Sequence, residues 1–166
     1  AFGKIDILVQ NAFMHGPFGG AVDSDPDDWR KVYKVNVMGT LQMVQACLPH
    51  MAARGSIVVT NSMASRTSTP LESAYAASKV ALRGLSRTAA LELGNAGVRV
   101  NGVCPGTSDT RMLSEETRSG GGLVAGLPIP RAARPEEIGA MVAYLLSDVA
   151  GYCTGQDFVV DGGATD

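Results

Sequence analysis

Three side chains that could together handle a proton occur at Ser62, Tyr75 and Lys79. Tyr75 and Lys79 are four residues apart in an alanine-rich segment, so on a helix their side chains lie on one face, one turn apart. A phenol titrates near about pH 10, and a neighbouring ammonium lowers that pKa and makes the hydroxyl a usable proton donor and acceptor. Ser62, at the end of an apolar run, is placed to polarise a carbonyl or hold an alkoxide. The three residues suit carbonyl–alcohol chemistry.

A Tyr-x-x-x-Lys pair also arises on helices by chance. An exposed tyrosine beside a solvated lysine is therefore the alternative interpretation of Tyr75 and Lys79. A catalytic group requires the neighbouring strands and helices to bring Ser62 next to Tyr75 and Lys79, whereas an exposed pair does not.

Hydrophobic patterning predicts four buried strands separated by helices. The strands are short apolar runs of the kind found in parallel sheets, at residues 5–9, 56–60, 98–103 and 158–160. The helices have apolar residues at helical spacing, from 26 to 51, from 74 to a glycine-containing stop at 94–97, and from 135 to 146. Strand-helix-strand order implies right-handed parallel crossovers, so an α/β protein with a parallel sheet is predicted.

Asn36 interrupts the apolar face of the first of these helices. A buried amide without hydrogen-bond partners costs about 1–3 kcal/mol. We therefore expect Asn36 either to tie down a local backbone segment or to hold a water molecule.

Polar and glycine-containing segments follow two of the predicted strands. Gln10-Asn11-Ala12 comes after the first strand and Pro105-Gly106 after the third. Ligands of α/β proteins bind outside the carboxyl ends of parallel strands, so cofactor contacts are expected at both segments. The connection from Thr107 to Pro130 is long enough to be a lid or binding loop.

These motifs, in this order and spacing, resemble the short-chain dehydrogenase/reductase family over nearly the whole chain. The matching motifs are Asn11-Ala12, Asn36, Ser62, Tyr75-Ala76-Ala77-Ser78-Lys79, Pro105-Gly106-Thr107-Ser108-Asp109-Thr110, and Gln156 with Asp161-Gly162-Gly163. The chain departs from the family at Gln10 and Phe13, where the family has Asn-Asn-Ala-Gly, and at Ser108, where an apolar residue is usual.

The resemblance implies a Rossmann-like doubly wound parallel sheet and an NAD- or NADP-dependent oxidoreductase that interconverts a carbonyl and a secondary alcohol by hydride transfer. In the implied roles, Tyr75 is the general acid/base, Ser62 orients the reacting oxygen, and Lys79 lowers the phenol pKa and holds the ribose. Asn36 would complete a proton relay through water to Lys79 and Tyr75. The implied cofactor contacts come from Asn11, Ala12, Tyr75, Lys79, Pro105, Gly106 and Thr110, of which Thr110 would hold the carboxamide.

The resemblance also implies that residues 107–130 close over the substrate, and that the protein pairs with itself as a homodimer or homotetramer through its long helices and its carboxyl-terminal segment.

Composition limits the partners and the compartment. A chain of 166 residues that is 45% hydrophobic is expected to form one domain, spanning 1–166. The formal net charge of −2 provides no basic field for nucleic acid or an anionic membrane, and no apolar run approaches the roughly 20 residues of a membrane span. The three widely spaced cysteines, Cys47, Cys104 and Cys153, favour free thiols in a reducing, cytoplasmic compartment.

No metal site is predicted. The acidic run from Asp23 to Asp28 lacks the glycine and the bidentate glutamate of a calcium loop, and it fits helix initiation instead, with Asp25 as N-cap and Pro26 in the first helical position. His15 and His50 are far apart and belong to no cluster of metal ligands, so a loop role and a helix-surface role are expected.

The four predicted strands do not make a complete dinucleotide-binding sheet. Such a sheet has further strands before residue 5 and a glycine-rich turn for the pyrophosphate, which this sequence does not contain. We therefore expect the carboxyl-terminal portion of such an enzyme, with an unpaired edge on its first strand. The alternative is a non-catalytic homologue that retains the oligomer surface and acts as an interaction module.

Overall fold

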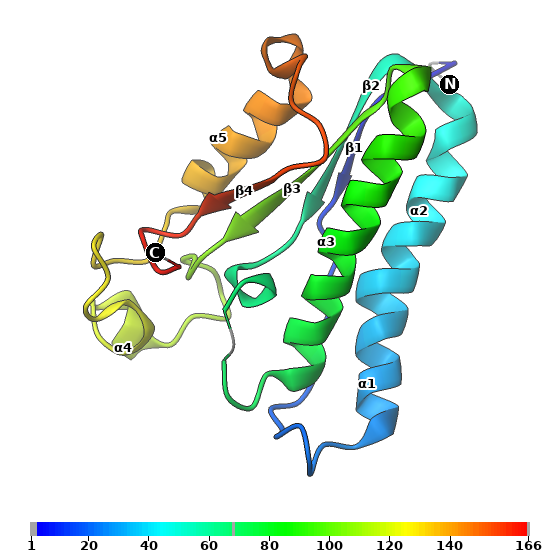
Figure 1. Cartoon of the computed structure of the whole chain (residues 1–166). Helices are drawn as coiled ribbons and strands as arrows, with labels where there is room; N and C mark the ends of the chain where they lie inside the picture. Colours follow the sequence, from blue (N-terminus) through cyan, green and yellow to red (C-terminus); the bar gives the residue numbers. More distant parts are fainter. Residues whose placement is uncertain (1–2, 68, 166) are drawn as a thin grey trace.

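The computed structural model describes residues 3–67 and 69–165, with the side chain of Ala52 left out, as a parallel sheet flanked by helices (Figure 1). The strands are β1 (Ile5–Gln10), β2 (Met51–Thr60), β3 (Arg99–Pro105) and β4 (Asp157–Val160). They pair in the order β1-β2-β3-β4, and every pair is parallel. The predicted α/β, Rossmann-like class is confirmed.

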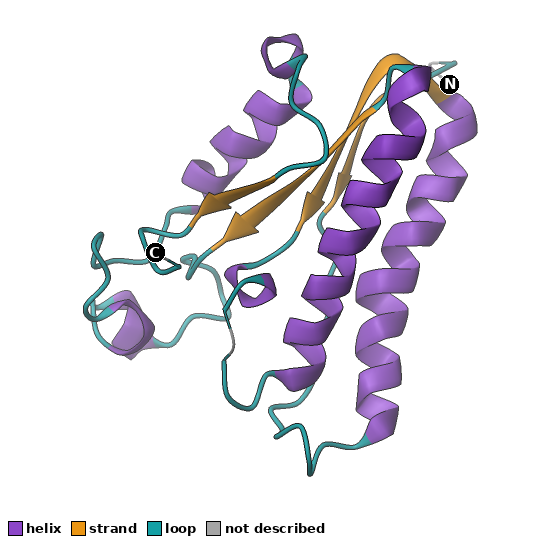
Figure 2. Cartoon of the chain, in the orientation of Figure 1, coloured by secondary structure: helices purple, strands orange, loops and turns teal. Residues whose placement is uncertain are grey.

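Helices cover both faces of the sheet, as Figure 2 shows in purple against the orange strands. Ile57 and Val59 of β2 point into a core with Leu82 and Ala90 of α3 (Ser73–Leu93), which also receives side chains of α2 (Gly39–Cys47). Val58 points to the opposite face, into a core with α5 (Pro135–Leu146). Successive strand residues thus supply different layers, and this explains why the strands are continuous apolar runs.

The segment predicted as one helix from 26 to 51 contains several elements. Asp25 caps α1 (Pro26–Tyr33) by accepting the Asp27 N–H at 2.8 Å, so the predicted start is confirmed. A π-helical turn occupies Lys34–Met38 before α2 begins at Gly39. The inserted turn surrounds Asn36, whose interactions are described below.

The same prediction was wrong at its carboxyl end, where Met51 belongs to β2. Pro49 has no amide hydrogen, and the chain tightens into a 3₁₀ turn at Leu48–His50 after α2 ends. Met51 then pairs with Ile5 of β1, and β2 is longer than the predicted 56–60. An irregularity in the register between Ile5 and Ile7 accommodates the extra residues.

The remaining boundaries are close to those predicted. After α3 a 3₁₀ turn at Gly94–Ala96 leads to Gly97, whose φ of +76° reverses the chain into β3. Helix α5 spans the predicted residues. The connection over 107–130 is not structureless, since it holds α4 (Glu115–Arg118) and a 3₁₀ turn at Gly122–Val124.

Strand β1 is at one edge of the sheet and is the least covered strand. Ile7 is 52% exposed and Val9 42% exposed, whereas Leu8, which points toward α2 and α3, is buried. Among the described residues, no helix is both long and apolar enough to cross a membrane.

Candidate active site

A cleft of about 600 Å³ opens at the carboxyl ends of β1, β2 and β3. It is lined by most of the residues predicted for the site: Asn11, Ser62, Tyr75, Lys79, Pro105, Gly106 and Thr110. Ala12 is exposed but does not line the cleft, and Asn36 is completely buried outside its lining. The fold therefore brings the proton-handling residues together with most of the predicted cofactor contacts.

Ser62 and Tyr75 meet in this cleft. Ser62 directly follows β2, and its hydroxyl accepts the Ala64 N–H at 3.1 Å, which fixes the start of a short 3₁₀ turn at Met63–Ser65. The same hydroxyl is close enough to the phenol of Tyr75 to affect its pKa. A reacting oxygen next to the phenol would therefore also be next to the serine hydroxyl.

Burial raises the pKa of Tyr75 above its ordinary value, because the phenolate would lose its hydration. The hydroxyl of Ser62 acts in the opposite direction and lowers this pKa, whereas the negative charge of Glu72 raises it further. We expected the ammonium of Lys79 to lower this pKa, but in this structure burial prevails. Lys79 Nζ lies over the phenol ring, 5.6 Å from its centre, and donates its hydrogen bond elsewhere.

Lys79 is only 2% exposed, and its ammonium donates to the main-chain carbonyl of Thr60 at 2.8 Å. Its Nζ atom also lies 5.4 Å from the centre of the Phe13 ring. Burial lowers the pKa of Lys79 to about 8, and the thiol of Cys104 acts in the opposite direction. An ammonium has three N–H groups, so two remain for a ligand in the cleft.

Asn36 joins three segments behind the cleft. Its Oδ1 accepts the Met14 N–H at 2.7 Å, and its Nδ2 donates to the Met14 carbonyl and to Ser78 Oγ, both at 2.9 Å. Of the two roles left open by the sequence, tying down a local backbone segment is therefore observed. The main-chain carbonyl of Asn36 accepts the Thr40 hydroxyl at 2.7 Å.

The far wall of the cleft comes from the loop after β3. A Cβ on Gly106 would lie 2.7 Å from Asp161 Cα, so only glycine allows this loop to approach the segment after β4. Ser108, which replaces the apolar residue usual in the family, donates its hydroxyl to the Gly106 carbonyl at 3.1 Å and also lines the cleft. Thr110 Oγ1 accepts the Met112 N–H at 3.4 Å.

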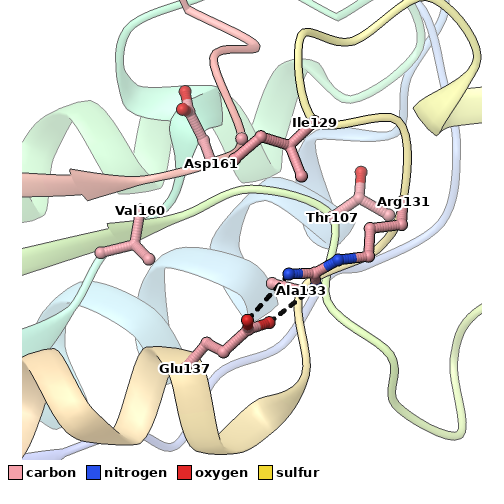
Figure 3. Close-up of a pocket in the computed structure, with 8 residues that line it drawn as sticks. Thr107, Ile129, Arg131, Ala133, Glu137, Val160 and Asp161 are labelled. Carbon is pink, nitrogen blue, oxygen red and sulfur yellow. Dashed lines mark hydrogen bonds and ion pairs between the residues drawn. The ribbon is translucent and has the colours of Figure 1, made fainter.

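The two ends of the 107–130 connection are fastened together beside a smaller cavity (Figure 3). Ala133 N–H donates to the Thr107 carbonyl at 2.9 Å, and Asp109 N–H donates to the Ala133 carbonyl at 2.8 Å. As Figure 3 shows, the guanidinium of Arg131 faces the carboxylate of Glu137 on α5, with two N–H···O contacts of 2.8 Å. Arg111 and Met112, which belong to the segment between these two ends, line the larger cleft.

Two residues at the site had no functional assignment from the sequence. Phe13, 44% exposed, lines the cleft with its ring centre 6.1 Å from that of Tyr75. His15 stacks on the Tyr75 ring, and its Nε2 lies 3.3 Å from Glu72 Oε1. A histidine in a glycine- and proline-rich loop carries no periodic signal, so the sequence offered nothing by which to find it.

The described residues contain no group of three or more His, Cys, Asp or Glu side chains that could hold a metal ion. Cys47, Cys104 and Cys153 are free thiols.

A parallel sheet flanked by helices, with a cleft at the carboxyl ends of its strands, defines the Rossmann-like class of α/β folds. A family model described as enoyl-(acyl carrier protein) reductase matches residues 1–165. Dehydrogenase/reductase SDR family member 4 of Bos taurus is 40% identical to this chain and aligns with 98% of it. A solved short-chain dehydrogenase/reductase from Serratia marcescens, 35% identical, superposes with a TM-score of 0.91 over 99% of this chain and 67% of its own. The chain belongs to the short-chain dehydrogenase/reductase family.

A further relative is trans-4-hydroxycyclohexanecarboxylate dehydrogenase of Sinomonas cyclohexanicum, 36% identical over 99% of this chain. The alignments cover 60% of the bovine relative and 62% of the Sinomonas one. The chain thus spans about three fifths of the length of the curated relatives it matches.

Proposed function

We propose that this protein is an NAD- or NADP-dependent oxidoreductase that interconverts a carbonyl and a secondary alcohol, with Tyr75 as general acid/base. The observation that carries the proposal is the convergence of Ser62, Tyr75 and Lys79 in one cleft at the carboxyl ends of the strands. Membership of an oxidoreductase family supports it.

In the reducing direction Tyr75 gives its phenolic proton to the carbonyl oxygen as that oxygen becomes an alcohol. A pKa raised by burial keeps the phenol protonated until a substrate arrives, which suits this donor role. Ser62, which lines the same cleft beside this phenol, donates to the reacting oxygen and stabilises the charge that develops on it. The nicotinamide cofactor, when bound, supplies or accepts the hydride.

The residues around the cleft fit such a cofactor in two respects. Lys79 has two N–H groups without a described protein partner, deep in the cleft, where ribose hydroxyls would accept them. The cleft walls formed by Asn11, Pro105, Gly106 and Thr110 are at the strand ends where α/β proteins hold cofactors. Ala12 would contribute only its backbone, since it does not line the cleft.

Asn36 would feed the proton relay through its main chain. Its side-chain amide is engaged by Met14 and Ser78, and its carbonyl accepts the Thr40 hydroxyl. In the proposed relay this carbonyl also receives a water molecule on the path to Lys79.

The substrates of the relatives suggest what to assay first. Cyclic secondary alcohols are the starting point, because one relative is a trans-4-hydroxycyclohexanecarboxylate dehydrogenase. We further propose a homodimer or homotetramer in the cytoplasm, in line with the free thiols and the acidic composition.

The second candidate is a non-catalytic interaction module. Two observations favour it: Phe13 projects into the cleft where the family has glycine, and the β1 edge exposes Ile7 and Val9. Titration with NADH and NADPH, followed by nicotinamide fluorescence, separates the candidates. Binding supports the enzyme, whereas no binding by a stable oligomer supports the module.

Substitution of Tyr75 by Phe tests the proposed acid. Tyr75→Phe removes the hydroxyl and keeps the ring, so turnover should fall by at least about 10²-fold while cofactor affinity stays within about twofold. Tyr33→Phe is the matched control, because Tyr33 lies on α1 and does not line the cleft. Full activity of Tyr75→Phe would refute the assignment.

A further inference from the structure

The imidazole of His15 lies flat against the phenol ring of Tyr75. The two ring centres are 4.7 Å apart and the planes meet at 24°, which is a stacked arrangement. Phe18 contacts the same imidazole, with a centroid separation of 4.8 Å. His15 comes from the loop after β1 and Tyr75 from α3, so the stack joins two elements at the site.

Two acceptors hold the imidazole in this position. Nδ1 lies 3.1 Å from the Gly16 carbonyl oxygen, and Nε2 lies 3.3 Å from Glu72 Oε1. A carbonyl and an ionised carboxylate can only accept hydrogen bonds, so both contacts are satisfied when both ring nitrogens carry a proton. These two contacts fix the orientation of the imidazole against Tyr75.

Glu72 acts on the phenol as well as on the imidazole. Its negative charge near Tyr75 disfavours the phenolate. Through its contact with Nε2 the same carboxylate also holds the imidazole against the face of the phenol ring.

We propose that His15 is a positioning residue for Tyr75, which holds the phenol ring by stacking while Glu72 and the Gly16 carbonyl anchor the imidazole. This inference rests on the proposed function for its consequence in catalysis. His15 touches the acid through the ring face and does not touch the reacting oxygen.

The charged groups around His15 are few. Glu72 and Tyr75 contact it, and the ammonium of Lys79 lies beyond, 5.6 Å from the Tyr75 ring centre. On the α1 side, Phe18 also lines a small cavity with the carboxylates of Asp23, Asp25 and Asp28. Asp25 caps α1 and Asp28 pairs with Lys31, so Glu72 is the carboxylate in contact with the imidazole.

An NMR measurement tests the stack without requiring turnover. Tyrosine labelled with 13C at Cζ gives one signal for each of four tyrosines, and the Tyr75 signal is identified by its loss in Tyr75→Phe. His15→Ala, which removes the stacked ring, should move the Tyr75 signal. His15→Phe, which keeps a flat ring against the phenol, should move it less.

His50, the other histidine, is the matched control, because it is exposed at the end of the turn before β2. His50→Gln should leave the Tyr75 signal unchanged. The inference is overturned if His15→Ala also leaves the Tyr75 signal where it is in the unmodified protein.

Kinetics test the positioning role. His15→Ala should lower kcat about three- to tenfold, the range that a stacked aromatic pair is worth, with KM changed less than about twofold. His15→Phe should recover most of that loss, which also controls for folding. Equal kcat in His15→Ala and the unmodified protein would overturn this role. If the unmodified protein reduces no carbonyl, the proposed function fails, while the NMR comparison still decides whether His15 stacks on Tyr75.

Discussion

At the residue scale, burial determines the protonation of the site. It raises the pKa of Tyr75 and lowers the pKa of Lys79 to about 8, so the same low-polarity surroundings disfavour the charged form of both. The ammonium nevertheless has a hydrogen bond to Thr60 and two aromatic faces beside it. The site thus retains a costly charge at a position where a ligand would use it.

The cost of burying Lys79 should appear in its effect on stability. The ordinary pKa is 10.5 and the folded value is about 8, so the unfolded chain binds more protons between these values. The penalty, about 3 kcal/mol, is fully present below pH 8 and is relieved as pH rises toward 10.5. Lys79→Met should therefore stabilise the protein by about 1–2 kcal/mol at pH 7, after the loss of the Thr60 partner, and by less at pH 10.

Urea unfolding at the two pH values measures this difference. Lys34→Met is the control, because Lys34 is exposed, and it should change stability by less than about 0.5 kcal/mol. A stabilisation of Lys79→Met that is equal at pH 7 and pH 10 would contradict the explanation.

At the element scale, the π-helical turn at Lys34–Met38 is the feature that places Asn36. Such turns widen a helix by one residue and are frequent at functional sites. Here the turn directs the side chain of Asn36 toward Met14, in the loop after β1, and toward Ser78 on α3. The apolar spacing around Asn36 predicted a helix correctly. It did not indicate the π-helical turn, because one inserted residue hardly changes the spacing of the apolar residues.

Removal of this amide should loosen the loop that follows β1. Asn36→Ala would leave the Met14 N–H and carbonyl without their partners, at a cost of about 2–4 kcal/mol in unfolding free energy. Thermal unfolding measures the loss, and faster amide exchange at Met14 locates it. Asn95→Ala, at an exposed asparagine after α3, should be nearly neutral. Unchanged exchange at Met14 would show that the loop is held by other contacts.

The ion pair of Arg131 with Glu137, called the clasp below, should hold the connection over 107–130, the proposed lid, in place. The guanidinium of Arg131 and the Arg134 N–H lower the pKa of Glu137 to about 2. The clasp is therefore at full strength above about pH 4.5, the ordinary carboxyl value, and is lost as pH falls through about 2. Glu137→Gln should open it at neutral pH, because the amide cannot form the charged pair.

Limited proteolysis across Gly120–Gly122 measures the opening at pH 7. Cleavage should be several-fold faster in Glu137→Gln than in Glu136→Gln, whose carboxylate is exposed on the same helix. Equal rates in the two variants would mean that the backbone contacts of Thr107 and Ala133 hold the lid alone.

At the scale of the whole molecule, the sheet is covered unequally. Helix α5 packs on β2, β3 and β4, whereas the same face of β1 exposes Ile7 and Val9. Exposed apolar side chains at a sheet edge promote association between molecules. The edge predicted from the sequence to be unpaired is the outermost strand of the described sheet.

This chain should therefore associate with itself through β1, so that its sedimentation coefficient rises with protein concentration. Ile7→Lys should weaken self-association several-fold with little effect on stability, because the side chain is half exposed in the folded chain. Val22→Lys is the control, since Val22 is 95% exposed but lies in the loop before α1. Association that is unchanged by Ile7→Lys would place the contact elsewhere.

The sequence by itself determined the four strands, the α/β class, the caps at Asp25 and Gly97 and the residues of the proton-handling group. These features depend on local periodicity and on side-chain chemistry, both of which can be recognised in the amino-acid sequence. The tertiary structure alone decided that burial raises the pKa of Tyr75, that Asn36 bonds Met14 through a π-helical turn, and that His15 stacks on the phenol. Solvation and contacts between distant segments arise only when the chain is packed, so no local pattern contains them.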